Sequence, residues 1–120
     1  MVLAREGEMQ QVLLNLALNA LEAILGVDGG EVTVGVTRRD EWVELSVSDN
    51  GRGMAPQTLE RVFEPFYTEK RVDRAEGRAG TGLGLSITHA IVAAHAGRIR
   101  AESAGIGKGS RFVVDLPGVP

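Results

Sequence analysis

Residues 42–54 read Trp-Val-Glu-Leu-Ser-Val-Ser-Asp-Asn-Gly-Arg-Gly-Met and join a strand pattern directly to a loop with two glycines. Apolar and polar residues alternate over the first part of this stretch, which is the period of a strand with one buried face. The apolar positions are Val43, Leu45 and Val47. Asp49 has the same parity as these residues, so its carboxylate points toward the predicted core. The stretch therefore predicts a half-buried strand that ends at an inward-facing acid.

This inward-facing acid has two interpretations. A buried carboxylate is costly unless it is hydrogen-bonded, and Asp-Asn-Gly commonly provides that bond by closing a turn on its own backbone. Alternatively, Asp49 accepts a hydrogen bond from a ligand, while Gly51 and Gly53 allow the backbone to approach that ligand. The turn is the commoner use of these residues, and only the further features below favour the ligand.

Hydrophobic patterning outside this stretch predicts an α+β fold. Val32, Val34 and Val36 alternate with polar residues before a polar turn at 38–41, which predicts a half-buried strand in a hairpin. The other predicted elements are helices over residues 8–25, 56–62 and 82–96 and strands over residues 98–103 and 110–116. This order is typical of a two-layer α/β sandwich with a mostly antiparallel, mixed sheet and helices on one face.

The last predicted helix has one apolar face on a step of about 100° per residue. The residues that share this face are Leu83, Ile87, Ala90, Ile91 and Ala94. We expect this face to be buried. His89 and His95 fall outside it, so surface or end-of-helix roles are expected for both histidines.

The composition is that of one ordinary globular domain. The chain has 120 residues, of which 43% are hydrophobic and 24% are charged, and its formal net charge is −3. This charge argues against binding to nucleic acid or to anionic lipid by electrostatic attraction. The absence of cysteine excludes a disulfide framework and a thiolate zinc site. No apolar stretch reads as a membrane span, and we expect no direct membrane contact by this domain.

The first predicted helix carries a polar stripe that contains carboxamides. Five polar residues fall within about 80° of one another on the helical wheel: Glu8, Gln11, Asn15, Asn19 and Glu22. One interpretation is the solvated side of an amphipathic helix. The other is a ligand site, because asparagine is a poor helix former and carboxamide, carboxylate and water oxygens are the ligands that Mg²⁺ prefers.

A glycine-rich segment, Gly80-Thr81-Gly82-Leu83-Gly84-Leu85-Ser86, leads into the last helix. It predicts successive backbone N–H groups at a helix N-terminus, where anions bind. It differs from the dinucleotide fingerprint, because no strand directly precedes it. Residues 68–80 predict a mobile polar loop, whose cations, including Lys70, are either solvated or close over phosphates. Combined with the acid and the carboxamides, the segment predicts a site for a purine nucleotide and Mg²⁺.

The order of these segments resembles the catalytic, ATP-binding domain of two-component sensor histidine kinases, in the superfamily that also holds DNA gyrase and MutL. Residues 11–20 resemble the N box, 49–54 the first glycine box, 62–68 the F box, 80–87 the second glycine box and 107–112 a closing Gly-x-Gly-[ST]-x-Phe signature. Within the superfamily, the F box is characteristic of the histidine kinases. The resemblance implies the histidine-kinase ATPase fold with its ATP-lid loop.

The resemblance also implies roles for the matched residues at the base and the metal. The adenine amino group would be accepted by Asp49, and the base pocket would be completed by Gly51, Gly53 and Ser110. Asn19 would ligate Mg²⁺, and Asn15 would support the metal and the phosphates. Asn15 stands where hydrolytic relatives carry a water-activating glutamate, which favours transfer to a protein acceptor over hydrolysis.

A further set of implied roles concerns the phosphates and the lid. Phosphate contacts are implied for Gly80, Thr81, Gly82, Leu83 and Gly84. Residues 68–79 would form the ATP lid, with Phe63 and Phe66 hinging it against the body. Lys70 is a candidate contact to the γ-phosphate, because cations stabilise charge on a transferred phosphoryl group.

The implied partners lie outside this chain. The acceptor histidine would sit on a separate dimerisation domain of the same protein, and a response regulator would act downstream. The chain alone is therefore expected to bind ATP without phosphorylating itself. Members of the class have further elements before the N box, so we expect residues 1–120 to be a single catalytic domain trimmed at its N-terminal edge. The implied location is the cytoplasm, as a free domain or as the cytosolic part of a membrane-bound sensor.

Two other functions stay open at this level. A regulatory module on the same fold, such as an anti-sigma factor that phosphorylates serine, would share the nucleotide site, although the F box and the long lid favour the histidine kinase. A scaffold that binds no nucleotide would use its glycines only as turns. Binding of Mg²⁺·ADP would separate the scaffold from the other two.

Overall fold

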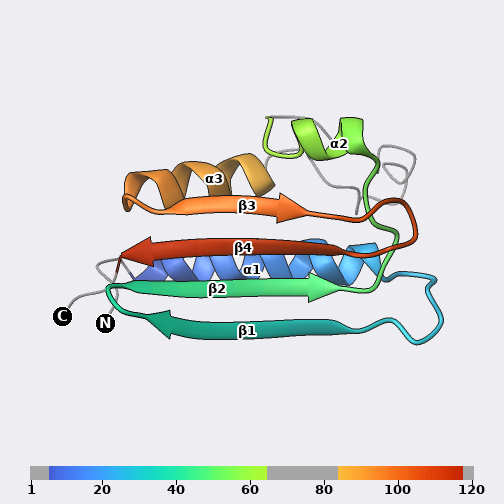
Figure 1. The fold of residues 1–120 in the computed structure, drawn as a ribbon, viewed down its shortest axis with the longest axis horizontal. Coiled ribbons are helices and arrows are strands. Elements are labelled where there is room, and N and C mark those ends of the chain that lie inside the picture. Colours follow the sequence, from blue (N-terminus) through green and yellow to red (C-terminus); the bar gives the residue numbers. More distant parts are fainter. Residues whose placement is uncertain (1–5, 65–83, 118–120) are drawn as a thin grey trace.

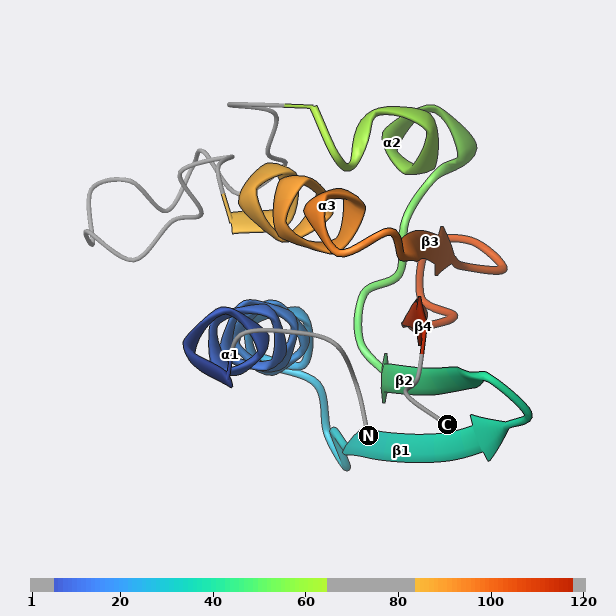
Figure 2. The ribbon, with the colours of Figure 1, turned by 90° about the vertical axis from the view of Figure 1, so that its left-hand side faces the viewer.

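Four strands form one antiparallel sheet, and two helices lie side by side on one of its faces. The structure, a computed structural model, describes residues 6–64 and 84–117. Its elements are α1 (Glu6–Ala23), β1 (Val32–Arg39), β2 (Trp42–Asp49), α2 (Pro56–Arg61), α3 (Gly84–Ala94), β3 (Arg98–Glu102) and β4 (Ser110–Pro117). In the described residues the strand order is β1-β2-β4-β3, and every neighbouring pair is antiparallel. With α1 and α3 on one face (Figures 1 and 2), this arrangement confirms the predicted two-layer α+β sandwich.

An apolar face holds α1 on the sheet. Val12, Leu16 and Ala20 recur every four residues, are buried, and belong to the same core cluster as Val47 of β2 and Phe112 of β4. This spacing is that of the core-facing side of an amphipathic helix. The helix begins and ends two residues earlier than predicted.

The predicted half-buried strand is only partly correct for β1. Val34 and Val36 are 51% and 68% exposed, although they pair with Val47 and Leu45 and so face the same side of the sheet. The reason is the position of β1 at the edge of the sheet, because α1 packs chiefly over β2. The hairpin turn is also tighter than predicted, since both strands extend to leave only residues 40 and 41 between them.

The buried face of α3 differs from the predicted one. Thr88 and Val92 are fully buried, whereas Ile87 is 43% exposed and both alanines of the predicted face are exposed. A buried face predicted from hydrophobicity alone omits Thr88, because threonine carries a polar hydroxyl. Its hydroxyl donates a 2.8 Å hydrogen bond to the carbonyl oxygen of Gly84, which satisfies the polar group and allows it to be buried.

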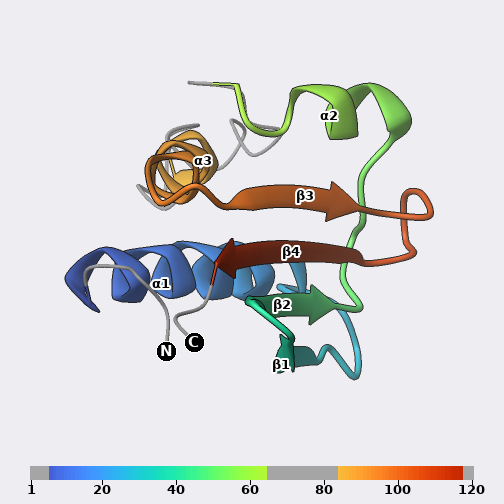
Figure 3. The ribbon, with the colours of Figure 1, turned by 60° about the vertical axis from the view of Figure 1, so that its left-hand side comes forward.

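The connection from β2 to α2 runs past the ends of β4 and β3 (Figure 3). Pro56 lies in the first turn of α2, where a backbone N–H would have no partner within the helix. The short helix predicted at 56–62 is confirmed. After α2, Phe63 packs on the core cluster, with its ring 6.2 Å from Phe112 in an edge-on arrangement. This segment therefore closes one end of the core.

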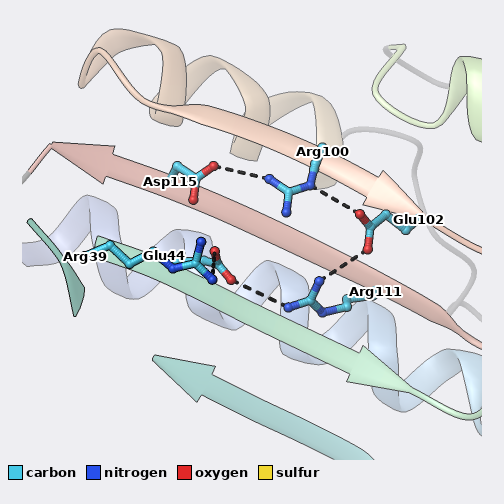
Figure 4. A network of polar contacts seen from close by, with 6 residues as sticks. All are labelled: Arg39, Glu44, Arg100, Glu102, Arg111 and Asp115. Atoms are coloured by element: carbon cyan, nitrogen blue, oxygen red, sulfur yellow. Dashed lines mark hydrogen bonds and ion pairs between the residues drawn. The ribbon is translucent and has the colours of Figure 1, made fainter. Parts of the chain in front are cut away.

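The face of the sheet opposite α1 and α3 carries a chain of ion pairs that crosses all four strands (Figure 4). Glu44 of β2 is contacted by Arg39 of β1 at 3.7 Å and by Arg111 of β4 at 3.6 Å. Glu102 of β3 lies 3.3 Å from both Arg111 and Arg100, and Arg100 also contacts Asp115. The arginines of these pairs and Glu102 are 41–69% exposed, whereas Glu44 and Asp115 are only 13% and 17% exposed. Solvent therefore reaches this network chiefly at its arginines and at Glu102.

We predict that Gly109→Ala destabilises the chain more than Gly107→Ala. Both glycines have a positive φ, +77° and +81°, which costs a residue with a side chain about 1–2 kcal/mol. A Cβ at Gly109 would also collide with the carbonyl oxygen of Asp49, whereas one at Gly107 meets nothing. Chemical denaturation should show a further loss of about 1–3 kcal/mol at Gly109; equal losses at the two positions would contradict the collision.

A second prediction concerns the ion-pair network. The hydrogen bond from Arg100 is the largest cause that lowers the pKa of Glu102 below its ordinary value; burial opposes it, and the hydrogen bond from Arg111 lowers the pKa further. A carboxyl with a depressed pKa stabilises the fold at pH values above its ordinary pKa. This contribution is lost as the pH falls through the lowered pKa. Arg100→Gln should move the pKa of Glu102 back upward in an NMR titration. Arg39→Gln, which removes a pair only from Glu44, is the control and should leave it unchanged.

Candidate functional site

The carboxylate of Asp49 lies buried at the end of β2, on the helix-covered side of the sheet. It is 9% exposed, as is Ser110, which is its partner across the β2–β4 pair. Its Oδ1 atom accepts a 2.9 Å hydrogen bond from the Gly51 N–H. Its Oδ2 atom is buried and has no hydrogen-bond partner among the described residues. The turn interpretation is therefore correct for one oxygen, and the second oxygen remains available to a donor.

The loop after Asp49 is packed between the end of α1 and the turn before β4. Arg52 donates its N–H to the carbonyl oxygen of Ala23 at 3.0 Å, and Gly109 donates to Gly51 at 3.1 Å. A Cβ on Gly51 would collide with Ala23, and one on Gly53, whose φ is +68°, would collide with Gly105. These close approaches of backbone to backbone explain both loop glycines without reference to a ligand.

Asn50 fastens this loop to the start of β1, which sequence reasoning missed. Its Oδ1 accepts a hydrogen bond from the Glu31 N–H at 2.6 Å, and its Nδ2 donates to the Gly29 carbonyl at 3.0 Å. The only sequence signal for this role of Asn50 was the Asp-Asn-Gly turn. The predictions gave Asn50 no role in that turn. The side chain holds the backbone next to Asp49 in place.

Asn15, in the carboxamide stripe of α1, faces α3. Asn15 donates from Nδ2 to the carbonyl oxygen of Gly84 at 3.2 Å and to the hydroxyl of Thr88 at 3.1 Å, and it accepts from Gln11 at 3.0 Å. Asn15 and Asn19 are both half-buried. The stripe is therefore no simple solvated face, because one of its members bonds directly to the first turn of another helix.

These contacts bring two separate segments to α1. Asn15 bonds the first turn of α3, and Ala23 bonds the loop that follows Asp49. Asn19 lies between them, and eight residues of helix span about 12 Å. The loop after the buried acid and the start of the last helix therefore both adjoin α1, which carries the carboxamides. Their convergence on one ligand stays a prediction.

Part of the predicted phosphate and lid region lies outside the described residues. This applies to residues 68–79 and to Phe66, Lys70, Gly80, Thr81, Gly82 and Leu83. Gly84 is described as the first residue of α3, and a Cβ there would meet nothing within 4 Å. Its N–H belongs to the helix terminus, where backbone donors lack intrahelical partners.

The two histidines have local structural contacts. His89 lies against the ring of Phe63, with the ring centroids 5.4 Å apart. The Nδ1 atom of His95 donates to the Ile91 carbonyl at 2.8 Å, because a carbonyl only accepts, and its Nε2 atom lies 3.4 Å from a Glu8 carboxylate oxygen. His95 thus connects the end of α3 to the start of α1, in agreement with an end-of-helix role.

Two kinds of feature are absent from the described part of the chain. No three side chains of His, Cys, Asp or Glu in residues 6–64 and 84–117 gather to hold a metal ion. Across the same residues, no helix has the length and hydropathy needed to cross a membrane.

Comparison with known families identifies the class. The family model described as histidine kinase-, DNA gyrase B- and HSP90-like ATPase matches residues 4–120. The chain belongs to this family of ATPases, which bind ATP, and the resemblance drawn from its motifs is confirmed.

Individual relatives place the chain with the sensor histidine kinases. The two-component sensor PprA of Pseudomonas aeruginosa is 43% identical over 97% of this chain and 12% of that protein. The solved structure of the mycobacterial sensor histidine kinase MprB is 30% identical with a TM-score of 0.81, covering 99% of this chain and 78% of that one. Full-length ShkA in complex with AMPPNP is 34% identical with a TM-score of 0.78, covering 97% and 22%. The chain is a histidine-kinase ATPase module that spans about an eighth of the length of PprA.

Proposed function

We propose that this module binds ATP with Mg²⁺ and presents the γ-phosphoryl group to a histidine on a separate dimerisation domain, from which a response regulator receives it. The observation that carries the proposal is the unpartnered, buried Oδ2 atom of Asp49. A buried carboxylate oxygen without a donor is unfavourable, and a ligand that supplies an N–H at this point removes that penalty. Residues 1–120 would act as one catalytic domain of a longer sensor kinase.

The adenine amino group is the donor that we assign to Asp49. An ionised carboxylate accepts hydrogen bonds only, so it selects a base with an exocyclic amino group. Ser110 lies beside Asp49 across the strand pair and offers a hydroxyl on the same face. The complex of the similar protein ShkA with AMPPNP, an analogue of ATP, supports an adenine nucleotide as the ligand.

The carboxamides of α1 are the residues that would hold Mg²⁺. Because no cluster of three acidic or imidazole side chains occurs in the described residues, a cation here would bind one or two protein oxygens, the phosphates and water, as Mg²⁺ commonly does. We assign Asn19 as the ligand and Asn15 as the residue that supports the metal and the phosphates. Bound Mg²⁺ would neutralise charge on the phosphates.

The carboxamide of Asn15 also bears on the fate of the phosphoryl group. A carboxamide takes up no proton near neutral pH, so it does not activate water as a carboxylate base would. Hydrolysis of bound ATP is therefore slow, and a better nucleophile on a partner domain receives the phosphoryl group. Positioning and charge stabilisation would supply most of the catalysis.

We predict that Asp49→Asn weakens binding of Mg²⁺·ADP by about tenfold or more, because the base loses a hydrogen bond to a charged acceptor. Isothermal titration calorimetry measures this loss. Asp115→Asn is the matched control, since it removes a carboxylate from the opposite face of the sheet and should leave the affinity unchanged. Binding of inorganic triphosphate should be nearly equal in wild type and Asp49→Asn; equal losses for both ligands would show that the base lies elsewhere.

A mixing experiment tests the transfer itself. The chain with Mg²⁺ and radiolabelled ATP should remain unlabelled alone and should label a separately expressed domain that carries the acceptor histidine. The product should be acid-labile, as a phosphohistidine is. An acid-stable phosphoserine would favour the serine-kinase alternative, and self-labelling of the chain would contradict the proposal.

A further inference from the structure

Thr88 is a polar residue at the centre of the contact between α1 and α3. It is fully buried and lies one turn after Gly84, the first residue of α3. Its hydroxyl donates to the Gly84 carbonyl at 2.8 Å and lies 3.1 Å from the Nδ2 atom of Asn15. The hydroxyl therefore uses both its proton and a lone pair within the same contact.

The Gly84 carbonyl and the Thr88 hydroxyl determine which way round the Asn15 carboxamide lies. A carbonyl oxygen accepts hydrogen bonds only, so the Asn15 atom that lies 3.2 Å from it must be the donor Nδ2. The proton of Thr88 is already given to the same carbonyl, so Thr88 too requires a donor from Asn15. Two acceptors thus hold Nδ2 toward α3.

This orientation leaves Oδ1 of Asn15 on the other side of the carboxamide. There it accepts a 3.0 Å hydrogen bond from Gln11, which belongs to the same polar stripe of α1. A carbonyl oxygen has a second lone pair, so Oδ1 keeps one acceptor position while it is bonded to Gln11. Water bound to a divalent cation is a strong donor and needs such an acceptor.

We propose that Thr88 is a positioning residue for the nucleotide site, which orients the Asn15 carboxamide so that Oδ1 accepts from the water shell of Mg²⁺. This inference rests on the proposed function. The same hydroxyl ties α1 to the first turn of α3, so it also sets the distance between the carboxamides and the helix start. Without the Thr88 hydroxyl, Nδ2 of Asn15 keeps only the Gly84 carbonyl as an acceptor. The carboxamide can then turn over, which exchanges the positions of Nδ2 and Oδ1.

The test separates this role from that of a buried hydroxyl that only stabilises the fold. Thr88→Val removes the hydroxyl, Thr88→Ser retains it, and Thr58→Val removes a second buried threonine hydroxyl, from α2. Calorimetry measures the affinity for ADP with Mg²⁺ and with EDTA in each variant, after circular dichroism has shown that it is folded. The quantity compared is the ratio of the two affinities, which a purely structural loss would not change.

In Thr88→Val we expect this ratio to fall about three- to tenfold, the size of one hydrogen bond. Thr88→Ser should restore it, and Thr58→Val should leave it at the wild-type value. NMR of the nucleotide-free chain gives a second readout: the Nδ2 protons of Asn15 should exchange with water faster in Thr88→Val than in wild type or Thr88→Ser.

Any of three results would overturn the inference. They are an unchanged affinity ratio in Thr88→Val, an equal fall of this ratio in Thr58→Val, and unchanged exchange of the Asn15 carboxamide protons in Thr88→Val. Failure of the proposed function has a different signature, because wild type would then not bind ADP at all. The exchange measurement still decides the orientation of Asn15 in that case.

Discussion

The packing of α1 against the sheet is the constraint on which the rest of the site depends. Val12, Leu16 and Ala20 bury one face of the helix against β2 and β4, and this fixes the rotation of α1 about its axis. Because a helix repeats every 3.6 residues, the same rotation turns Asn15 toward α3. The backbone end of α1 then reaches the loop after Asp49 through Ala23. The packing of the core thus sets the positions of Asn15 and of the loop after Asp49.

The polar groups of the site are hydrogen-bonded by both local and distant neighbours, with one exception among the described residues. Asn15 and Thr88 bond each other and the first turn of α3, and Asn50 bonds the start of β1. These bonds connect the surroundings of the site to neighbouring elements. The exception, Oδ2 of Asp49, is buried within this hydrogen-bonded frame, where a donor from a ligand gains most from meeting it.

The two faces of the sheet carry different kinds of residues. One face carries the apolar core, the two packed helices and the buried acid. The other carries the ion-pair chain from Arg39 to Asp115 (Figure 4), in which each carboxylate meets at least one arginine. Since strand residues alternate between faces, Asp49 and Asp115 stand at opposite sides of the same sheet. The same residue type is therefore a ligand candidate on one side and part of an ion-pair network on the other.

Local patterns determined the elements, their order and most of the residues of the candidate site. Period-two alternation identified β1 and β2, and the Asp-Asn-Gly turn marked the inward acid, because both signals lie within a few neighbouring residues. Other outcomes depended on distant contacts that no local pattern contains. The edge position of β1 left Val34 and Val36 exposed, and the core accepted Thr88 in place of more apolar residues because a backbone carbonyl satisfied its hydroxyl. The tertiary structure alone decided that Oδ2 of Asp49 is buried without a partner and which way the Asn15 carboxamide faces. Burial and hydrogen bonds between remote residues exist only once the chain has brought those residues together.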